Sequence, residues 1–381
     1  LLPILDGTIL STILDSAIDV IDEAIIVVGF KKEQVIEEFG DEYKGIKLKY
    51  VEQKEQLGNG HAILCAEEYL KDRFLVLFGE DLTSPVDINN LVKHRYACLA
   101  QEVEDPSRFG IFVTDDDNYI TNIEEKPEVP KSNLANTGIW VMDRKLLECM
   151  KTVGKSPRGE YEITDALGEL LKSEKVYCQP IEDYWIPITY PWNLLEANVH
   201  FLKKIKESKI DGIIEPGAVV NGTVVIGKGT TIKSGTVIQG PVFIGENSTI
   251  GPQAYIRKDS IILNNVELRG EVYDVIIMSG VASKHNSYLA HSVIGERCNI
   301  GCGTVTADYR HDADVNFTMV KGQKINTGRR KLGAFLGYKC HTGIGTLLYP
   351  GRKMWPFCTT LPGEIVKKDI EDSEIKSTEK R

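Results

Sequence analysis

The fold is decided by a stretch that begins Ile226-Gly227-Lys228-Gly229-Thr230-Thr231-Ile232 and repeats its pattern every six residues. A β-branched aliphatic residue returns at this spacing without a slip, at Ile214, Val220, Ile226, Ile232, Ile238, Ile244, Ile250, Ile256 and Ile262. Glycine or proline falls in the turns between these positions, and glycine permits backbone conformations there that a Cβ would oppose. This period indicates a parallel β-helix, in which each hexapeptide forms one side of a triangular coil and points its aliphatic residue inward.

The same register returns at Ile294 and Ile300, and again at Leu336, Leu348 and Met354. It lapses between about 307 and 331, where we expect a loop thrown out from the coil. Such coils bury a core only by stacking on their neighbours. The alternative to a catalytic β-helix is one that serves only as a scaffold or a trimer anchor.

The residues before the repeat have an α/β pattern. Helical segments are expected near 9–21, 31–39, 61–70, 143–153 and 161–174. The apolar runs 24–29 and 74–79 end in glycine and predict central strands of a mostly parallel sheet covered on both faces. Ligands of such sheets bind at the carboxyl ends of the strands, and Glu80 and Asp81 follow one of these ends.

Composition narrows the class of protein. The 381 residues suffice for two packed domains, and the net charge of −10 disfavours nucleic acid as the main partner. No apolar run is long enough to span a membrane, and the apolar start lacks the basic residues of a secretory signal. The eight scattered cysteines are interpreted as reduced thiols of a cytoplasmic protein.

Several separated motifs follow one another along the chain in the same order as in one family of proteins. They are Glu55-Gln56-Leu57-Gly58-Asn59-Gly60-His61-Ala62, Asp105-Pro106-Ser107-Arg108-Phe109-Gly110, Glu124-Glu125-Lys126-Pro127, Ser132–Gly138, Tyr190–Asn198 and Gly328–Ala334. In this order the chain resembles the archaeal-type bifunctional sugar-1-phosphate nucleotidylyltransferase/acetyltransferases. The resemblance implies a Rossmann-like α/β nucleotidyltransferase domain over 1–205, a left-handed parallel β-helix of the acyltransferase type over 206–366, and a charged, solvated tail over 367–381.

For the first domain the resemblance implies transfer of a uridylyl or thymidylyl group from UTP or dTTP to a sugar 1-phosphate. Gln53, Gly58 and Asn59 would contact the nucleobase. The sugar-phosphate residues would be Gly110, Glu125, Lys126 and Asn136, with Lys126 as the cation. A charged surface turn at 125–126, and ordinary polar roles for Gln53 and Asn136, are the structural alternatives.

The first domain departs from the family in three places. The glycine-rich pyrophosphate loop is absent, because the chain begins where the residues after it would be. Glu80, followed by Asp81, stands where the family has an Asp that binds Mg²⁺. A second metal-binding Asp aligns with Pro187, which has no ligating side chain.

For the β-helix the resemblance implies acetyl transfer from acetyl-CoA to the amine of glucosamine 1-phosphate or galactosamine 1-phosphate. His285 matches the general base, and the acceptor contacts would be Arg257, Tyr288, Asn299 and Asp308. Arg329, Arg330 and Lys331 would bind the phosphates of CoA or of the sugar, and a homotrimer is implied. The alternatives are an exposed corner histidine at 285 and a solvated loop at 329–331.

Two substitutions also mark the second site. A family lysine aligns with Tyr273, and Asp308 stands where an Asn is expected, so that we expect its charge to repel a phosphorylated substrate. His291 is near but outside the motif and is expected to be structural.

Three functions therefore compete. The first is an enzyme that acetylates an amino-sugar 1-phosphate and then couples the product to a nucleotide. The second is a non-catalytic regulatory or assembly subunit of a pyrophosphorylase-like or exchange-factor complex. The third is a nucleotidylyltransferase whose β-helix only oligomerises.

Overall fold

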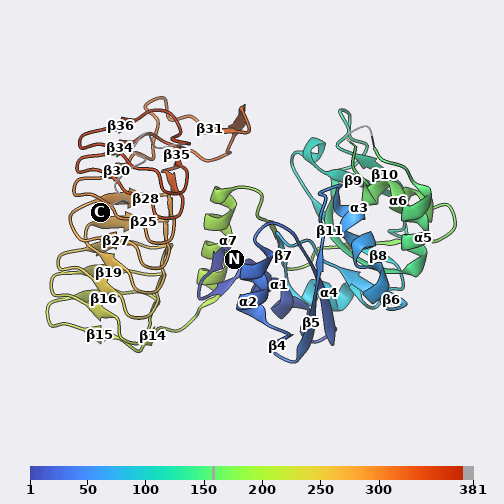
Figure 1. Ribbon diagram of the computed structural model, residues 1–381, viewed down its shortest axis with the longest axis horizontal. Coiled ribbons are helices and arrows are strands. Elements are labelled where there is room, and N and C mark those ends of the chain that lie inside the picture. Colours follow the sequence, from blue (N-terminus) through green and yellow to red (C-terminus); the bar gives the residue numbers. More distant parts are fainter. Residues whose placement is uncertain (157–158, 372–381) are drawn as a thin grey trace. The chain divides into compact units, whose positions relative to one another are not determined.

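The computed structural model describes residues 1–156 and 159–371, and the chain forms two compact units (Figure 1). The first unit contains Leu1 and Ile9–Pro187, and the second contains Leu2–Thr8 and the described residues from Ile188 onward. Within the described residues, no helix has the length and apolar character needed to cross a membrane.

The first unit combines helices with three small sheets. Its helices are α1 (Ile9–Ala17), α2 (Lys32–Phe39), α3 (Asn59–Cys65), α4 (Pro85–Leu91), α5 (Arg144–Thr152) and α6 (Ile163–Leu170), with 3-10 turns η1 (Glu67–Tyr69) and η2 (Pro106–Arg108). Its strands are β3 (Glu23–Val28), β4 (Glu42–Tyr43), β5 (Ile46–Glu52), β6 (Arg73–Val76), β7 (Asp81–Thr83), β8 (Ala97–Glu102), β9 (Gly110–Thr114), β10 (Ile120–Glu125), β11 (Leu134–Asp143), β12 (Tyr177–Pro180) and β13 (Trp185–Pro187).

The main sheet of this unit has the order β10-β9-β11-β8-β12, and β6 also pairs with β11. Its pairs are antiparallel except β12–β8, and the separate sheet β3-β5-β4 contains the parallel pair β3–β5. The expected Rossmann-like unit with a mixed sheet is confirmed, but the prediction of mostly parallel pairing was wrong. Apolar β-branched runs indicate a buried strand, and they do not specify the direction of its neighbours.

The two runs predicted as central strands are β3 and β6, and both are edge strands among the described residues. The sheet order gives β3 a single paired neighbour, β5, and gives β6 a single neighbour, β11. Most of their residues are only half-buried for this reason. The core of the unit lies instead around β8 and β11, where Cys98, Leu99, Ile139 and Trp140 are fully buried.

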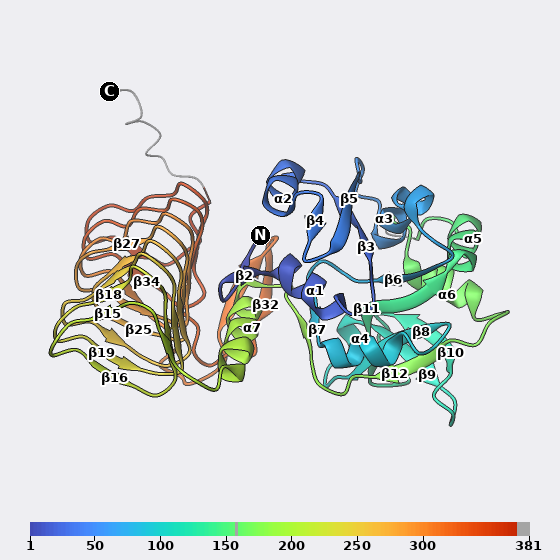
Figure 2. The same cartoon turned by 90° about the horizontal axis from the view of Figure 1, so that it is seen from below.

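The second unit is a parallel β-helix with three sheets, one on each side of the coil (Figures 1 and 2). The first side contains β14 (Lys209–Ile210), β17 (Val224–Ile226), β20 (Val242–Ile244), β23 (Ser260–Ile262), β26 (Ile276–Ile277), β29 (Val293–Ile294), β33 (Phe335–Leu336) and β35 (Lys353–Met354). The second contains β15 (Ile213–Ile214), β18 (Thr231–Ile232), β21 (Thr249–Ile250), β24 (Glu267–Leu268) and β27 (Ala282–Ser283). The third contains β16 (Val219–Asn221), β19 (Val237–Gln239), β22 (Tyr255–Ile256), β25 (Glu271–Tyr273), β28 (Tyr288–Ala290), β30 (Val305–Thr306), β34 (Leu347–Leu348) and β36 (Ile365–Val366).

The six-residue period is confirmed as the inward-facing column of the coil. Ile226, Ile232, Ile238 and Ile244 are each fully buried, and they belong to one continuous cluster that extends to Val366. Each of these side chains stacks on the equivalent residue one coil away, as Ile232 does on Ile250. Apolar burial of this kind stabilises each coil only through its neighbours.

The coil contacts a helix that the sequence analysis assigned to the first domain. Helix α7 (Pro191–Lys204) and the hairpin of β1 (Pro3–Ile4) and β2 (Gly7–Thr8) belong to the second unit. Asn198 joins them, because its Oδ1 accepts from Leu5 N at 2.8 Å and its Nδ2 donates to Pro3 O at 2.9 Å. The contacts therefore divide the chain near 187, whereas the resemblance placed the boundary at 205.

At the far end the coil continues past the predicted limit of 366. Ile370 forms a parallel bridge with Met354, and Lys353 Nζ lies 2.7 Å from Asp369 Oδ2. The remainder of the predicted tail, 372–381, lies outside the described residues.

The excursion expected between 307 and 331 is present and contains a hairpin that the sequence analysis missed. Strands β31 (Phe317–Val320) and β32 (Gln323–Asn326) pair antiparallel and project from the coil (Figure 1). Thr318 anchors this hairpin by donating its hydroxyl to Gly351 O at 2.7 Å.

Candidate functional site

The acceptor residues predicted in the β-helix lie on successive coils of one sheet. Arg257 follows β22, Tyr288 begins β28 and Asp308 follows β30. In this sheet Tyr255 is the register partner of Glu271, and Glu271 is the register partner of Tyr288. Tyr288 in turn pairs with Val305 on the next coil. The parallel register therefore stacks residues that are distant in sequence at the same edge of the coil.

Direct contacts connect these residues. Arg257 donates to Glu271 Oε1 at 2.9 Å, and its guanidinium lies 4.3 Å from the ring centroid of Tyr273. The Tyr288 hydroxyl lies 3.5 Å from Asp308 Oδ2. Burial, with a further contribution from the negative charge of Asp308, raises the pKa of Tyr288, so that the phenol is neutral at physiological pH.

Behind Asp308 lies a group that we name the His291 cluster: Asp274, His291, Asp308 and Arg329. The imidazole Nδ1 lies 2.7 Å from Asp274 Oδ2, and Nε2 lies 3.3 Å from Asp308 Oδ2. Arg329 donates to Asp274 Oδ2 at 2.7 Å. The side chain of His291 is only 6% exposed. We expected the charge of Asp308 to repel a phosphorylated substrate, and the structure adds that this carboxylate lies 3.3 Å from a buried imidazole.

The predicted general base lies at a corner of the same coil. His285 is exposed in the turn between β27 and β28, three residues before Tyr288. Asn299 is also exposed, and its backbone forms a bridge with Ala282 on the neighbouring coil. These two residues therefore occupy the side of the coil next to the Arg257–Tyr288–Asp308 group.

The basic string divides into two kinds of residue. Arg329 has a side chain that is 19% exposed, and besides Asp274 it contacts Glu196 Oε1 of α7 at 3.3 Å. Arg330 and Lys331 are exposed. Because its guanidinium already serves two carboxylates, Arg329 is poorly suited to a substrate phosphate, whereas its two neighbours stay open to solvent.

In the first unit the predicted nucleobase residues adjoin one another. Gln53 Nε2 donates to Gly58 O at 3.1 Å, and Asn59 Oδ1 accepts from Ile163 N at 3.2 Å. Gly58 has a φ of +96°, and a Cβ there would lie 3.0 Å from the carbonyl oxygen of Tyr161. The glycine is therefore required at this turn into α3 by both conformation and space.

Three of the four predicted sugar-phosphate residues also converge. A Cβ on Gly110 would lie 3.0 Å from Glu125 Oε2 and 3.7 Å from Asn136 Cβ. Asn136 is held by Trp140, whose indole donates to its Oδ1 at 2.8 Å. Lys126 adopts a left-handed backbone with a φ of +46°, and its Nζ lies 3.8 Å from Glu125 Oε1.

The predicted metal carboxylates do not form a matched pair. Asp81 is buried and faces Pro187 in the β7–β13 ladder, whereas Glu80 is exposed. Burial, together with the charge of Glu80, raises the pKa of Asp81 to about 8. No group of three or more His, Cys, Asp or Glu side chains in 1–156 and 159–371 is arranged to hold a metal ion. Asp81 opposite a proline offers one buried carboxyl, whereas a magnesium ion needs several oxygen ligands in octahedral geometry.

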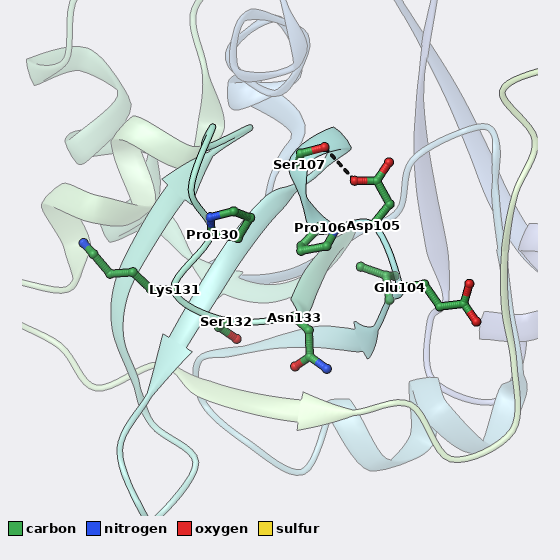
Figure 3. Close-up of a pocket in the computed structure, with 9 residues that line it drawn as sticks. Glu104, Asp105, Pro106, Ser107, Pro130, Lys131, Ser132 and Asn133 are labelled. Carbon is green, nitrogen blue, oxygen red and sulfur yellow. Dashed lines mark hydrogen bonds between the residues drawn. The ribbon is translucent and has the colours of Figure 1, made fainter. Parts of the chain in front are cut away.

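A separate hollow of about 660 Å³ lies in the first unit, and none of the predicted site residues lines it (Figure 3). Two loops form it, Val103–Ser107 and Pro130–Asn133. The hydroxyl of Ser107 donates to Asp105 Oδ1 at 2.6 Å within it. The hollow adjoins the motif that ends at Gly110, but its open, acidic lining does not suit a phosphate.

Comparison with known proteins agrees with the motifs. Residues 1–204 match the family described as nucleotidyl transferase. The chain is 40% identical over 375 residues to "Bifunctional protein GlmU" of Methanocaldococcus jannaschii, covering 98% of this chain and 90% of that protein. It is 37% identical over 342 residues to the "Bifunctional sugar-1-phosphate nucleotidylyltransferase/acetyltransferase" of Sulfurisphaera tokodaii, covering 88% of this chain and 85% of that protein.

One solved structure supports the fold alone. UDP-glucose pyrophosphorylase complexed with UDP-glucose aligns with a TM-score of 0.50 and 23% identity, covering 54% of this chain and 90% of that one. The resemblance expected from the motifs is confirmed by the family match and by these relatives. The chain belongs to the archaeal-type family of bifunctional sugar-1-phosphate nucleotidylyltransferase/acetyltransferases.

Proposed function

We propose that the β-helix unit transfers an acetyl group from acetyl-CoA to the amine of an amino-sugar 1-phosphate, either glucosamine or galactosamine 1-phosphate. The observation that carries this proposal is the meeting of Arg257, Tyr288 and Asp308 at one edge of the coil. This arrangement offers a guanidinium for a phosphate, a phenol for a sugar hydroxyl and a carboxylate for an amine.

In the proposed reaction His285 is the general base. An ammonium has no lone pair, so its proton must leave before the nitrogen attacks the thioester carbonyl. His285 takes this proton, the C–N bond forms, the C–S bond breaks, and CoA leaves as its thiol. The exposed position of His285 keeps its imidazole accessible to both substrates. Arg330 and Lys331 are proposed to hold the phosphates of CoA, because Arg329 is engaged by Asp274 and Glu196.

The test is release of CoA thiol from acetyl-CoA in the presence of each amino-sugar 1-phosphate. Wild-type protein is expected to release thiol, and His285→Ala is expected to lose about 10²-fold or more of kcat. His311→Ala, which removes another exposed histidine from the same unit, serves as the matched control and retains activity. No release with either amine by folded wild-type protein would favour the non-catalytic assembly subunit.

We also propose that the first unit transfers a nucleotidyl group from UTP or dTTP to the acetylated sugar 1-phosphate. The convergence of Gly110, Glu125 and Asn136 supports a sugar-phosphate site, and the contact between Gln53 and Gly58 supports a base site. Such reactions depend on positioning two anions for in-line displacement. Pyrophosphate release from UTP and dTTP, with N-acetylglucosamine 1-phosphate as acceptor, tests this proposal.

The family's nucleotidyl transfer uses magnesium. Of the residues predicted for the nucleotidyl site, Glu80 and Asp81, the metal ligands, are the ones whose arrangement supports that role least. If the protein transfers acetyl groups but releases no pyrophosphate, acetyl transfer is its only activity of the two proposed here. The predicted homotrimer and cytoplasmic location belong to the same proposal. Sedimentation equilibrium of the purified protein tests the trimer.

A further inference from the structure

The most unusual feature of the second unit is a buried histidine between two carboxylates. The imidazole of His291 lies 2.7 Å from Asp274 Oδ2 on one side and 3.3 Å from Asp308 Oδ2 on the other. Its side chain is 6% exposed, and those of the two carboxylates are 12% and 13% exposed. The contact with Asp308 meets the distance for an ion pair, but Nε2 lacks a well-directed hydrogen bond among the described residues.

The contacts place each nitrogen of the ring toward a different carboxylate. Nδ1 lies within hydrogen-bond distance of Asp274 Oδ2, whereas Nε2 faces Asp308 Oδ2 at ion-pair distance. Arg329, 2.7 Å from Asp274 Oδ2, adds a guanidinium to the same group of side chains.

The surroundings hold the ring in this position. The Tyr273 ring packs edge-on against His291, with centroids 4.9 Å apart, and Arg257 covers the same tyrosine. Glu196 on α7 binds the other side of Arg329 at 3.3 Å. Asp308 in turn reaches the Tyr288 hydroxyl at 3.5 Å. A continuous chain of contacts thus leads from the buried cluster to the proposed acceptor site.

A carboxylate in such a site needs this support. An uncompensated negative charge at position 308 would repel the phosphate of the acceptor, and burying it unpaired is costly. Because the His291 ring lies 3.3 Å from Asp308 Oδ2, it fixes the direction of this carboxylate, which can then bind a positive group. The positive group of the proposed acceptor is its ammonium.

We propose that Asp308 binds the ammonium of the acceptor and that His291, a positioning residue, holds the Asp308 carboxylate in place for this task. The proposal rests on the acetyl transfer proposed above. It makes the acceptor a protonated primary amine that also bears a phosphate, and it gives Asp308 a specificity role that a neutral amide could fill only in part.

A double-mutant cycle between positions 291 and 308 tests the proposal. Thiol release is measured for wild-type protein, His291→Gln, Asp308→Asn and the double variant, with kcat and KM for glucosamine 1-phosphate and for acetyl-CoA. Glutamine keeps hydrogen-bonding capacity and removes the imidazole ring that faces Asp308. His291→Gln should lower kcat/KM for the amine about tenfold or more and leave KM for acetyl-CoA unchanged, since the two residues form one network.

Rescue separates positioning from mere structural support. In the Asp308→Asn background the carboxylate that His291 holds is absent, so the further change His291→Gln should cost less than about threefold. Because the double variant has no unpaired carboxylate at 308, it should also fold if the single His291→Gln variant does not. A loss of the same size in both backgrounds would overturn the proposal.

A second readout isolates the ammonium. Glucose 1-phosphate lacks the amine and is used as a competitive inhibitor. Asp308→Asn should raise KM for glucosamine 1-phosphate and leave the inhibition constant of glucose 1-phosphate within about twofold. Equal weakening of both ligands would overturn the role of Asp308. A wild-type protein that acetylates no amine contradicts the proposed function as well, whereas an active wild type without rescue contradicts this inference alone.

Discussion

Asp81 and Pro187 face each other as register partners in the antiparallel ladder of β7 and β13. The proline offers no ligand, and burial, with the charge of Glu80, raises the pKa of Asp81 to about 8. At pH 7 this carboxyl is therefore mostly neutral. The relationship explains in physical terms why the predicted magnesium site is incomplete, since a cation would have to displace a proton from its one buried ligand.

The raised pKa of Asp81 predicts how the stability of the first unit depends on pH. Between its ordinary value of 3.8 and about 8, the folded state binds this proton more tightly than the unfolded state does. The free energy of unfolding should therefore decline as pH rises from about 4 to 8, by at most about 1.4 kcal/mol per pH unit from this group. Urea unfolding across this range should show that Asp81→Asn removes the decline.

Magnesium supplies the control for this prediction. At pH 8, millimolar Mg²⁺ should raise the melting temperature of wild-type protein no more than that of Asp81→Asn, because the pair Asp81–Pro187 does not hold the ion. A larger rise in wild-type protein would show that Asp81 binds magnesium despite its neutral state, through the linkage between ligand binding and stability.

Gly110 is predicted to be essential to the nucleotidyl site. A Cβ there would lie 3.0 Å from Glu125 Oε2, so Gly110→Ala should displace this carboxylate and raise KM for the sugar 1-phosphate about tenfold. Gly154→Ala is the matched control, because its added Cβ would meet nothing within 4 Å. Pyrophosphate release measures both. Equal kinetics for the two variants would remove Gly110 and Glu125 from the site.

The inward-facing column of the β-helix predicts that truncating one aliphatic side chain in it lowers the stability of the protein strongly. Ile250 is fully buried between its register partners Ile232 and Leu268. Ile250→Ala should lower the free energy of unfolding by about 2–5 kcal/mol, through lost burial and the cavity left behind. Val219→Ala, at a position 47% exposed, should cost about 0.5 kcal/mol or less. Similar losses for both would contradict the inward register, and urea unfolding distinguishes these outcomes.

The sequence predicted the structure best in the β-helix, where successive coils place equivalent residues in the same buried environment. Ile232 and Ile250 occupy equivalent places on successive coils, so the period alone predicted their burial. The hairpin of β31 and β32 lies outside the repeat, and its strands are too short to give a periodic signal. Strand direction in the first unit depends on pairing between distant segments, which local composition does not encode.

The His291 cluster was missed, although the sequence contains a signal for part of it. Asp274, His291 and Asp308 are spaced by 17 residues, the same spacing that relates Tyr273 to its partner Ala290 one coil away. Titratable residues at the coil spacing must therefore stack. Arg329 had no such signal, because the excursion after Asp308 breaks the register before the arginine returns to the coil.

The last prediction separates the two arginines of the basic string. Arg330 is exposed, whereas Arg329 is held by Asp274 at 2.7 Å and by Glu196 at 3.3 Å. Arg330→Ala should raise KM for acetyl-CoA about three- to tenfold, since it removes a charged donor to phosphate. Arg329→Ala should instead leave KM for acetyl-CoA within about twofold and lower the melting temperature, because Asp274 loses one of its two partners and keeps only His291. Thiol-release kinetics and thermal unfolding of the two variants decide between these roles. A larger rise in KM for acetyl-CoA in Arg329→Ala than in Arg330→Ala would return Arg329 to the CoA site, and would mean that its two carboxylate partners release it when substrate binds.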